Sequence, residues 1–293
     1  MMVDTTEVLP REQFPPLLKE IPEPPKTLRY RGVLPDFKNP ELKFLCVVGA
    51  RKYTAYGKSV VTGLIEGLRG YPIIIISGLA LGIDALAHEA ALDNQLTTIA
   101  VPGSGLDDGV LYPRTNLSLA RRILEAGGCL LSEFEDDFKA TTWSFPQRNR
   151  IMAGLAHAVL VIEAEQKSGT LITSRLATDY NREVLAVPGP ITQSTSAGPH
   201  MLIRLGATPV TSSKDILEVF GIETVKDTEH IVTPKNLSPE EEKLWQIINE
   251  PKSKDEIAIE IALPITTVSA IISLLELRGL IREENGRFHK TIL

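Results

Sequence analysis

Residues 72–84, PIIIISGLALGID, decide the fold. Ile73 to Ile76 form an apolar run of strand length that closes at Ser77-Gly78. The run has no polar alternation, which is typical of a strand covered on both faces. A helical pattern begins a few residues later, over 82–93. A buried strand followed at once by a helix is the repeating unit of a parallel α/β sheet.

The same alternation extends in both directions from this stretch. Strands are predicted at 44–49, 72–77, 97–102, 128–132, 158–163 and 184–188, and helices between them at 57–69, 82–93, 115–126, 146–157 and 170–180. Shorter elements follow at 198–205, 207–210 and 212–220. The sequence therefore predicts an α/β domain over residues 41–221, with a Rossmann-like, doubly wound and mostly parallel sheet.

The segments that flank this region differ from it in character. Residues 1–40 contain eight prolines and no sustained periodicity. Proline fixes φ and removes a backbone donor, so we expect a proline-rich, extended lead-in packed on the surface of the sheet domain. Residues 222–236 are polar and are expected to form a linker to a second unit.

The last segment, residues 237–293, is predicted to fold separately. Its first helix is marked by a capping residue, Ser238, then Pro239 and acidic residues in the first turn. Helices are predicted at 239–250, 253–261 and 265–278, with Gly279 ending the third, and residues 280–283 and 287–289 can pair across a turn at 284–286. Three helices followed by a hairpin are the winged-helix arrangement.

The composition is that of an ordinary globular protein, with 43% hydrophobic and 23% charged residues. No apolar run approaches the ~18–20 residues of a membrane helix, and no secretory signal is found. Cys46 and Cys129 fall in predicted buried strands and have neither disulfide nor metal spacing. We therefore expect a reducing, cytoplasmic location. The net charge of −6 means that any DNA-binding cations must be concentrated in one place.

Small and polar residues gather where the predicted strands end. They form turns at 49–51, 77–84, 103–105, 167–170 and Gly189. The carboxyl ends of parallel strands meet at one edge of the sheet, where ligands bind. Backbone N–H groups of such turns and of helix N-termini attract anions. One such glycine is usually only a tight connection, but five along one edge favour a phosphate-binding ledge.

Nucleotide-cofactor fingerprints do not accompany these turns. Gly49-Ala50-Arg51-Lys52 stands where G-x-G-x-x-G would begin, and no G-x-x-x-x-G-K-[ST] occurs. Glu163 lies at a strand end and could be a general base, but no nucleophile or metal-ligand set accompanies it. No cofactor, metal or catalytic residue is predicted, and the chain is not expected to be an enzyme.

The strongest local signal is Phe145-Pro146-Gln147-Arg148-Asn149-Arg150, preceded by Trp143-Ser144. Two arginines near a helix start, with aromatic residues just before them, suit phosphate binding next to a base-stacking platform. Two alternatives stay open. The arginines can pair with nearby carboxylates, namely Glu133, Glu135, Asp136 and Asp137, and Phe145 can be a plain core residue.

Three further features have both a functional and a structural interpretation. Asp84 opens a helix and can cap it. His88 lies one turn further on, and without a partner in motif spacing it indicates packing or capping. Tyr112-Pro113 can stack on a base or can only turn the chain.

Many of these motifs, taken in order, resemble the DNA-processing protein A (DprA, also called Smf) family from about Phe14 to the C-terminus. The matching stretches include Val48-Gly49-Ala50-Arg51, the Ser77–Asp84 loop, Leu111-Tyr112-Pro113, Phe145–Gly154, Glu163-Ala164, Ser168–Thr173 and Ala186-Val187-Pro188-Gly189. The order and spacing of so many motifs make the match specific.

The resemblance implies a Rossmann-like domain that binds and protects single-stranded DNA and hands it to the RecA recombinase during natural transformation. It also implies a homodimer, no enzymatic activity and a small C-terminal winged-helix domain. The DNA-contact residues expected from it and from the turns above are Arg51, Ser77, Gly78, Phe145, Arg148, Asn149, Arg150, Lys167, Ser168, Gly169 and Thr170.

The chain departs from the family pattern in two ways. Leu81 occupies a position that is usually basic, which removes one expected cation from the binding edge. The N-terminal helical domain of many members is missing, which puts in doubt any contact made through it. Residues 226–293 carry 9 basic and 12 acidic residues, whereas a winged helix that reads duplex DNA normally presents basic charge. This unit is expected to pack on the main domain or to meet a partner protein.

Two other functions remain as alternatives. Lysine-decarboxylase-like relatives with the same type of sheet hydrolyse nucleoside monophosphates, but their P-G-G-x-G-T-x-x-E stretch is absent, and Pro102-Gly103-Ser104-Gly105 is only a fragment of it. A sensor of free nucleotides without catalysis is also compatible with glycine-rich turns.

Overall fold

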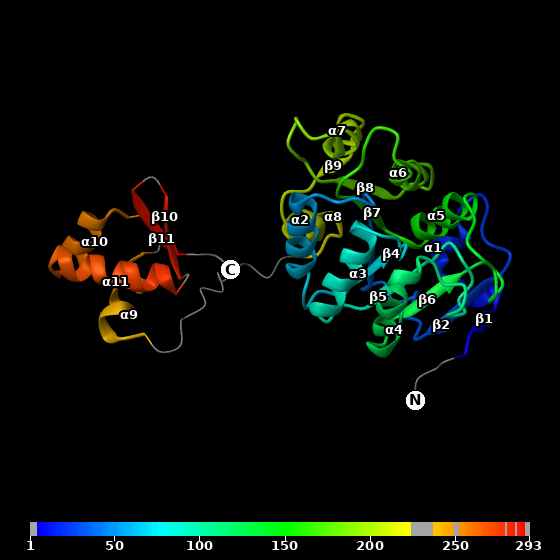
Figure 1. The fold of residues 1–293 in the computed structure, drawn as a ribbon, viewed down its shortest axis with the longest axis horizontal. Coiled ribbons are helices and arrows are strands. Elements are labelled where there is room, and N and C mark those ends of the chain that lie inside the picture. Colours follow the sequence, from blue (N-terminus) through cyan, green and yellow to red (C-terminus); the bar gives the residue numbers. More distant parts are fainter. Residues whose placement is uncertain (1–4, 224–236, 249–251, 279, 285, 291–293) are drawn as a thin grey trace. The chain divides into compact units, whose positions relative to one another are not determined.

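The computed structural model describes residues 5–223, 237–248, 252–278, 280–284 and 286–290. The chain divides into two compact units, Met1–Glu223 and Thr224–Leu293. The first unit is built on one nine-stranded sheet, in the order β1-β2-β6-β5-β4-β3-β7-β8-β9 (Figure 1). Its strands are β1 (Glu7–Leu9), β2 (Leu28–Gly32), β3 (Lys43–Val48), β4 (Ile73–Ser77), β5 (Thr98–Ala100), β6 (Cys129–Ser132), β7 (Ala158–Val161), β8 (Glu183–Ala186) and β9 (Thr208–Pro209).

The centre of the sheet is a point where the strand order reverses. β3 pairs in parallel with β4 on one side and with β7 on the other, and each neighbour leads outward through further parallel strands. This is the topological switch point of a doubly wound sheet, where loops from the two directions diverge and leave a crevice. The predicted Rossmann-like sheet is confirmed.

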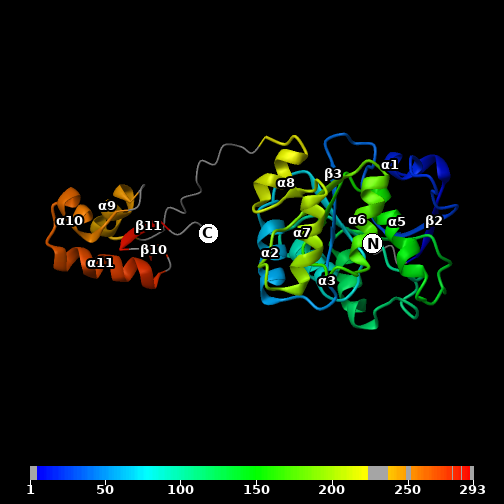
Figure 2. The ribbon, with the colours of Figure 1, turned by 90° about the horizontal axis from the view of Figure 1, so that it is seen from above.

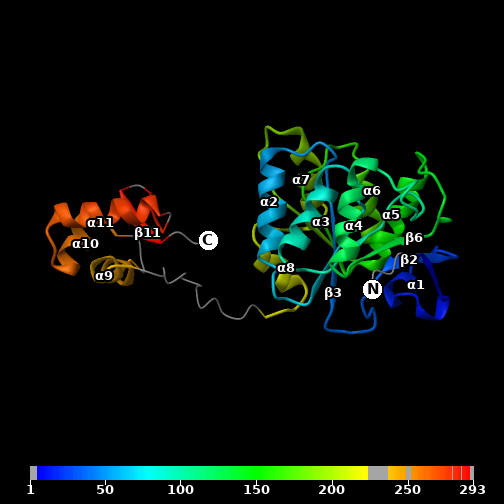
Figure 3. The same cartoon turned by 60° about the horizontal axis from the view of Figure 1, so that its bottom comes forward.

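Helices cover both faces of this sheet. One face carries α2 (Ala55–Glu66), α3 (Ile83–Asp93), α4 (Leu117–Glu125) and α8 (Ser213–Val219); the first three lie side by side in Figure 3. The other carries α1 (Pro16–Lys19), α5 (Ser144–Leu155), α6 (Thr170–Asp179) and α7 (Ala197–Arg204), of which α5 and α6 are neighbours in Figure 2. Strand residues therefore alternate between two cores: Leu45 and Val47 face the first layer, and Phe44 and Cys46 the second.

The proline-rich N-terminal segment contains two strands that the sequence pattern does not predict. β2 pairs antiparallel with β6, from Arg29 opposite Ser132 to Gly32 opposite Cys129, and β1 pairs antiparallel with β2. The prolines lie outside both strands, so they remove no ladder hydrogen bond. The segment expected as a surface lead-in thus extends the sheet at one edge.

The second unit contains the elements of a winged helix. These are α9 (Pro239–Ile247), α10 (Lys254–Ile261) and α11 (Ile265–Leu277), followed by β10 (Ile281–Glu284) and β11 (Arg287–Lys290), which pair antiparallel. Ser238 and Glu241 form the capping box that starts α9. The core includes Trp245, Ile272 and Phe288. Gly279, Asn285 and most of the expected linker, 224–236, lie outside the described residues.

No single helix among the described residues is long and apolar enough to span a bilayer. α10 and α11 reach that length and hydropathy only together, as a pair bent by 112°.

Candidate nucleic-acid interface

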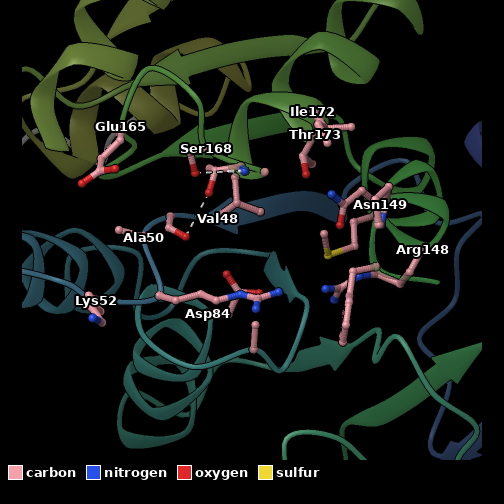
Figure 4. Close-up of a pocket in the computed structure, with 18 of the residues that line it drawn as sticks. Val48, Ala50, Lys52, Asp84, Arg148, Asn149, Glu165, Ser168, Ile172 and Thr173 are labelled. Atoms are coloured by element: carbon pink, nitrogen blue, oxygen red, sulfur yellow. Dashed lines mark hydrogen bonds between the residues drawn. The ribbon is translucent and has the colours of Figure 1, made fainter. Parts of the chain in front are cut away.

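An open cleft of about 560 Å³ lies at the carboxyl ends of β3 and β7, at the switch point of the sheet (Figure 4). We call it the edge cleft. Five segments line it: the end of β3 with Gly49 to Lys52, the start of α3 with the loop before it, the first half of α5 with Thr142, the start of α6 with the loop before it, and Thr195. Of the residues expected to contact DNA, seven line it, namely Arg51, Phe145, Arg148, Asn149, Ser168, Gly169 and Thr170.

Arg148 forms the floor of the edge cleft and is only 4% exposed. Its guanidinium donates a hydrogen bond to the carbonyl of Val101. A Cβ on Gly78 would stand 1.8 Å from Nη1 of Arg148, so any other residue there would displace the guanidinium from this position. Gly78, expected as a DNA contact, therefore lies behind the cleft and shapes it.

Asp84 provides the negative charge that acts on Arg148, and the two side chains approach each other from opposite directions (Figure 4). It is 6% exposed, and one carboxylate oxygen accepts from the backbone N–H of Gly78 at 3.2 Å. Burial raises the pKa of Asp84, while Arg148 and the N–H groups of Ala80 and Gly78 oppose that rise. Burial likewise lowers the pKa of Arg148, against the attraction of Asp84. Asp84 thus balances the charge of the floor.

Phe145 and Arg51 form one side of the mouth of the edge cleft. Phe145 is half-buried on α5 and lies against Gly103, where a Cβ would come within 2.6 Å of the ring. The exposed Arg51 places its guanidinium carbon 5.3 Å from the centroid of the Phe145 ring. This cation–π geometry presents a positive charge and an aromatic surface side by side.

The N-terminus of α6 also lines the edge cleft. Gly169 is its N-cap, and Thr170 begins a helix of ten residues. The Thr170 hydroxyl donates to the carbonyl of Gly49 at 3.0 Å, and the Ser168 hydroxyl accepts from the N–H of Thr170 at 3.2 Å. The first bond joins the α6 terminus to the end of β3, and the second closes the turn that begins α6. The positive end of the helix dipole therefore lies at the cleft that Arg51 also lines, which suits a phosphate.

Three expected contact residues lie elsewhere. Arg150 pairs with Glu133 at 2.5 Å and also donates to the carbonyl of Glu23, so it joins α5 to the end of β6 and to the N-terminal segment. The alternative carboxylate pairing therefore applies to Arg150. Ser77 is fully buried and donates to the carbonyl of Val47 at 2.7 Å. Lys167 is exposed next to Ser168 but does not line the cleft.

Two charged residues of the cleft were not singled out from the sequence. Lys52 adds a second exposed cation beside Arg51, and Glu165 adds an anion near Ser168. Both come within three residues of a predicted strand end, and residues at such positions line the ligand-binding edge of a parallel sheet. This position in the sequence could have identified them. Figure 4 shows Lys52 and Glu165 towards the same end of the cleft, with Arg148 towards the other.

Two titratable residues have structural partners. Glu163 is 2% exposed and accepts from the backbone N–H and hydroxyl of Thr54, at 3.0 and 2.5 Å, and from the hydroxyl of Thr195 at 3.2 Å. Since Thr54 caps α2, Glu163 holds that cap in place. His88 is fully buried 2.7 Å from the Thr98 hydroxyl, and burial lowers its pKa to about 3. It is therefore neutral at neutral pH.

The comparisons with known proteins agree with this architecture. Residues 7–221 match the family model of DNA recombination-mediator protein A. The chain belongs to this family. Residues 232–287 match the DprA winged helix domain, and the first match spans the whole sheet, with β1 and β2 included. The recognition of the DprA/Smf family from its motifs is confirmed.

Individual members of the family match over most of the chain. Protein Smf of Escherichia coli is 38% identical over 94% of this chain and 75% of its own length. DNA processing protein DprA of Streptococcus pneumoniae is 42% identical over 71% of each chain. The X-ray structure of the S. pneumoniae protein superposes with a TM-score of 0.67 and 37% identity, covering 76% of each chain. DNA processing protein A of Helicobacter pylori, whose structure concerns its single-stranded DNA binding mode, gives a TM-score of 0.64 and 29% identity over 74% of this chain and 97% of its own.

Proposed function

We propose that this family member binds single-stranded DNA in the edge cleft. One observation carries the proposal: the switch point brings an exposed arginine, a half-exposed aromatic ring and a helix N-terminus to one opening. The cation and the helix terminus suit the phosphate, and the ring suits an unpaired base. A duplex keeps its bases stacked inside, so a site that combines phosphate and ring contacts favours a single strand.

The wider role follows from the family. The H. pylori relative is described by its single-stranded DNA binding, and the family model by recombination mediation. We propose that the chain acts in the cytoplasm without catalysing a reaction, protects incoming single strands in natural transformation, and loads the RecA recombinase onto them. We also propose a homodimer. Leu205, 76% exposed just before edge strand β9, supplies an apolar side chain for such a contact.

Binding is tested by titrating the protein with oligo-dT at several salt concentrations. The two tryptophans differ usefully: Trp143, directly before α5, is 53% exposed, whereas Trp245 is 4% exposed in the second unit. In a Trp245→Phe background we expect oligo-dT to change the Trp143 fluorescence. Affinity should fall as salt rises, because phosphate contacts release counterions. A titration without any fluorescence or anisotropy change at low salt would contradict the proposed function.

Leu81 offers a test of the binding edge outside the cleft. Its side chain is 47% exposed in the loop before α3, so it is not a core residue. We expect Leu81→Arg to tighten oligo-dT binding several-fold at low salt and to steepen the salt dependence, since it restores a cation at the edge. Leu81→Gln is the matched control without charge. Equal affinities for the two variants would place this loop away from the DNA.

A further inference from the structure

Tyr112 is an exposed aromatic residue beside the edge cleft that does not line it. It follows β5 and lies before α4, and its side chain is 49% exposed. The centroid of its ring lies 5.7 Å from that of Phe145, with the planes tilted by 50°. Phe145 therefore has two different neighbours, Arg51 and Tyr112.

The backbone around Tyr112 is held on both sides. The flanking residues Leu111 and Pro113 are buried. Asn116 donates from Nδ2 to the carbonyls of Leu79 and Ala80, at 2.9 and 3.1 Å, which fastens this segment to the loop before α3. An exposed ring on an anchored backbone loses little conformational entropy when a ligand covers it.

Asp108 anchors the other end of the same loop. It pairs with Arg31 of β2 at 2.6 Å and with Arg121 of α4 at 2.7 Å, and its carbonyl accepts from Arg114. These contacts join the loop to the N-terminal strand and to a helix of the sheet. Tyr112 is therefore presented by a fixed scaffold while its ring remains half open to solvent.

The sheet order gives the direction in which Tyr112 extends the edge cleft. The cleft lies at the ends of β3 and β7, and Tyr112 follows β5, two strands further along the same edge. The Tyr112 and Phe145 rings are too close for a base to lie between them, since a base needs contacts of ~3.5 Å on each side. Only the remaining exposed face of Tyr112 is available.

We propose that this face of Tyr112 is a second base-stacking subsite, which takes the base of a nucleotide next to those in the edge cleft. The subsite rests on the proposed function, because the strand must first occupy the cleft. It predicts that the bound strand runs from the α6 terminus past Phe145 and across the ends of β4 and β5. Tyr112 then contributes to the affinity for bases and not for phosphates.

The test compares oligo-dT with an abasic oligonucleotide of the same length, using wild type, Tyr112→Leu and Tyr112→Phe. We expect Tyr112→Leu to bind oligo-dT roughly tenfold more weakly and to bind the abasic strand as wild type does, because only a base can stack. Tyr112→Phe keeps the ring and should match wild type on both. Thermal unfolding of each variant checks that the loop remains folded.

The other possible role of Tyr112 is to support Phe145, and a double variant separates the two. If Tyr112 contacts a base itself, Tyr112→Leu still weakens oligo-dT binding in a Phe145→Leu background at low salt. If it only supports Phe145, the second substitution adds nothing, and the subsite is refuted. An equal loss on both strands, or no loss on either, also refutes it. If wild type binds neither strand, the proposed function fails and the subsite with it.

Discussion

Arg148→Ala is expected to lower the free energy of unfolding of the sheet unit by about 1–3 kcal/mol, because it leaves the Val101 carbonyl without its donor and removes the stronger of the two positive charges, Arg148 and Arg51, that oppose the buried Asp84 carboxylate. That is a large part of the ~5–15 kcal/mol that stabilises a typical domain. Urea unfolding followed by Trp143 fluorescence measures it, in a Trp245→Phe background. A midpoint equal to that of the parent protein would show that Arg148 does not balance Asp84.

The pH dependence of the stability of Arg148→Ala shows whether the buried charge of Asp84 causes the loss. Without Arg148, the pKa of Asp84 rises further, so between the ordinary carboxyl value and the raised value the folded state binds more protons than the unfolded state. Stability then increases as the pH falls through this window, and the defect of Arg148→Ala should be smaller at pH 5 than at pH 7. The matched control is Arg148→Ala with Asp84→Asn, which should recover part of the loss and show little pH dependence.

Much of the fold could be predicted from the sequence because the strands are apolar on both faces. Runs such as Ile73–Ile76 place alternate side chains in the two cores, so every residue is apolar and the run is easily recognised. Every predicted strand and helix of the sheet domain is present. β2 was missed because Leu28–Gly32 is an added antiparallel strand with three polar residues in five. Its position in the sheet is decided by pairing with β6, a distant part of the chain, and a local sequence pattern carries no information about such a pairing.

The site was predicted as a region but not residue by residue. Arg148 and Arg150 are two positions apart on α5, and at 3.6 residues per turn their side chains point to nearly opposite sides. The pattern identifies the segment but not its rotation, so it could not say that Arg148 faces the cleft and Arg150 faces Glu133. The burial of Arg148 also depends on the missing Cβ of Gly78, some 70 residues earlier in the chain.

Arg51 and Phe145 should account for most of the affinity for single-stranded DNA, because they are the cation and the ring at the mouth of the edge cleft. We expect Arg51→Ala and Phe145→Leu each to weaken oligo-dT binding by roughly tenfold, and the double variant by about a hundredfold if the effects are independent. Fluorescence anisotropy with a labelled oligo-dT measures the three constants. Arg69→Ala changes an exposed arginine before β4, at the opposite edge of the sheet, and should bind as wild type does.

The salt dependence of binding distinguishes the phosphate contact expected of Arg51 from the base stacking expected of Phe145. A phosphate contact contributes about −0.7 to the slope of log K against log salt for a single strand, and a stacking contact contributes little. Arg51→Ala should therefore make the slope shallower by about that amount, whereas Phe145→Leu should leave it unchanged while the affinity falls. A loss in the double variant that is smaller than the sum of the single variants' losses would mean that Arg51 and Phe145 act as one unit through their cation–π contact. An unchanged slope for Arg51→Ala would show that Arg51 only positions the Phe145 ring, and the phosphate contact would then have to come from the N-terminus of α6 and from Lys52.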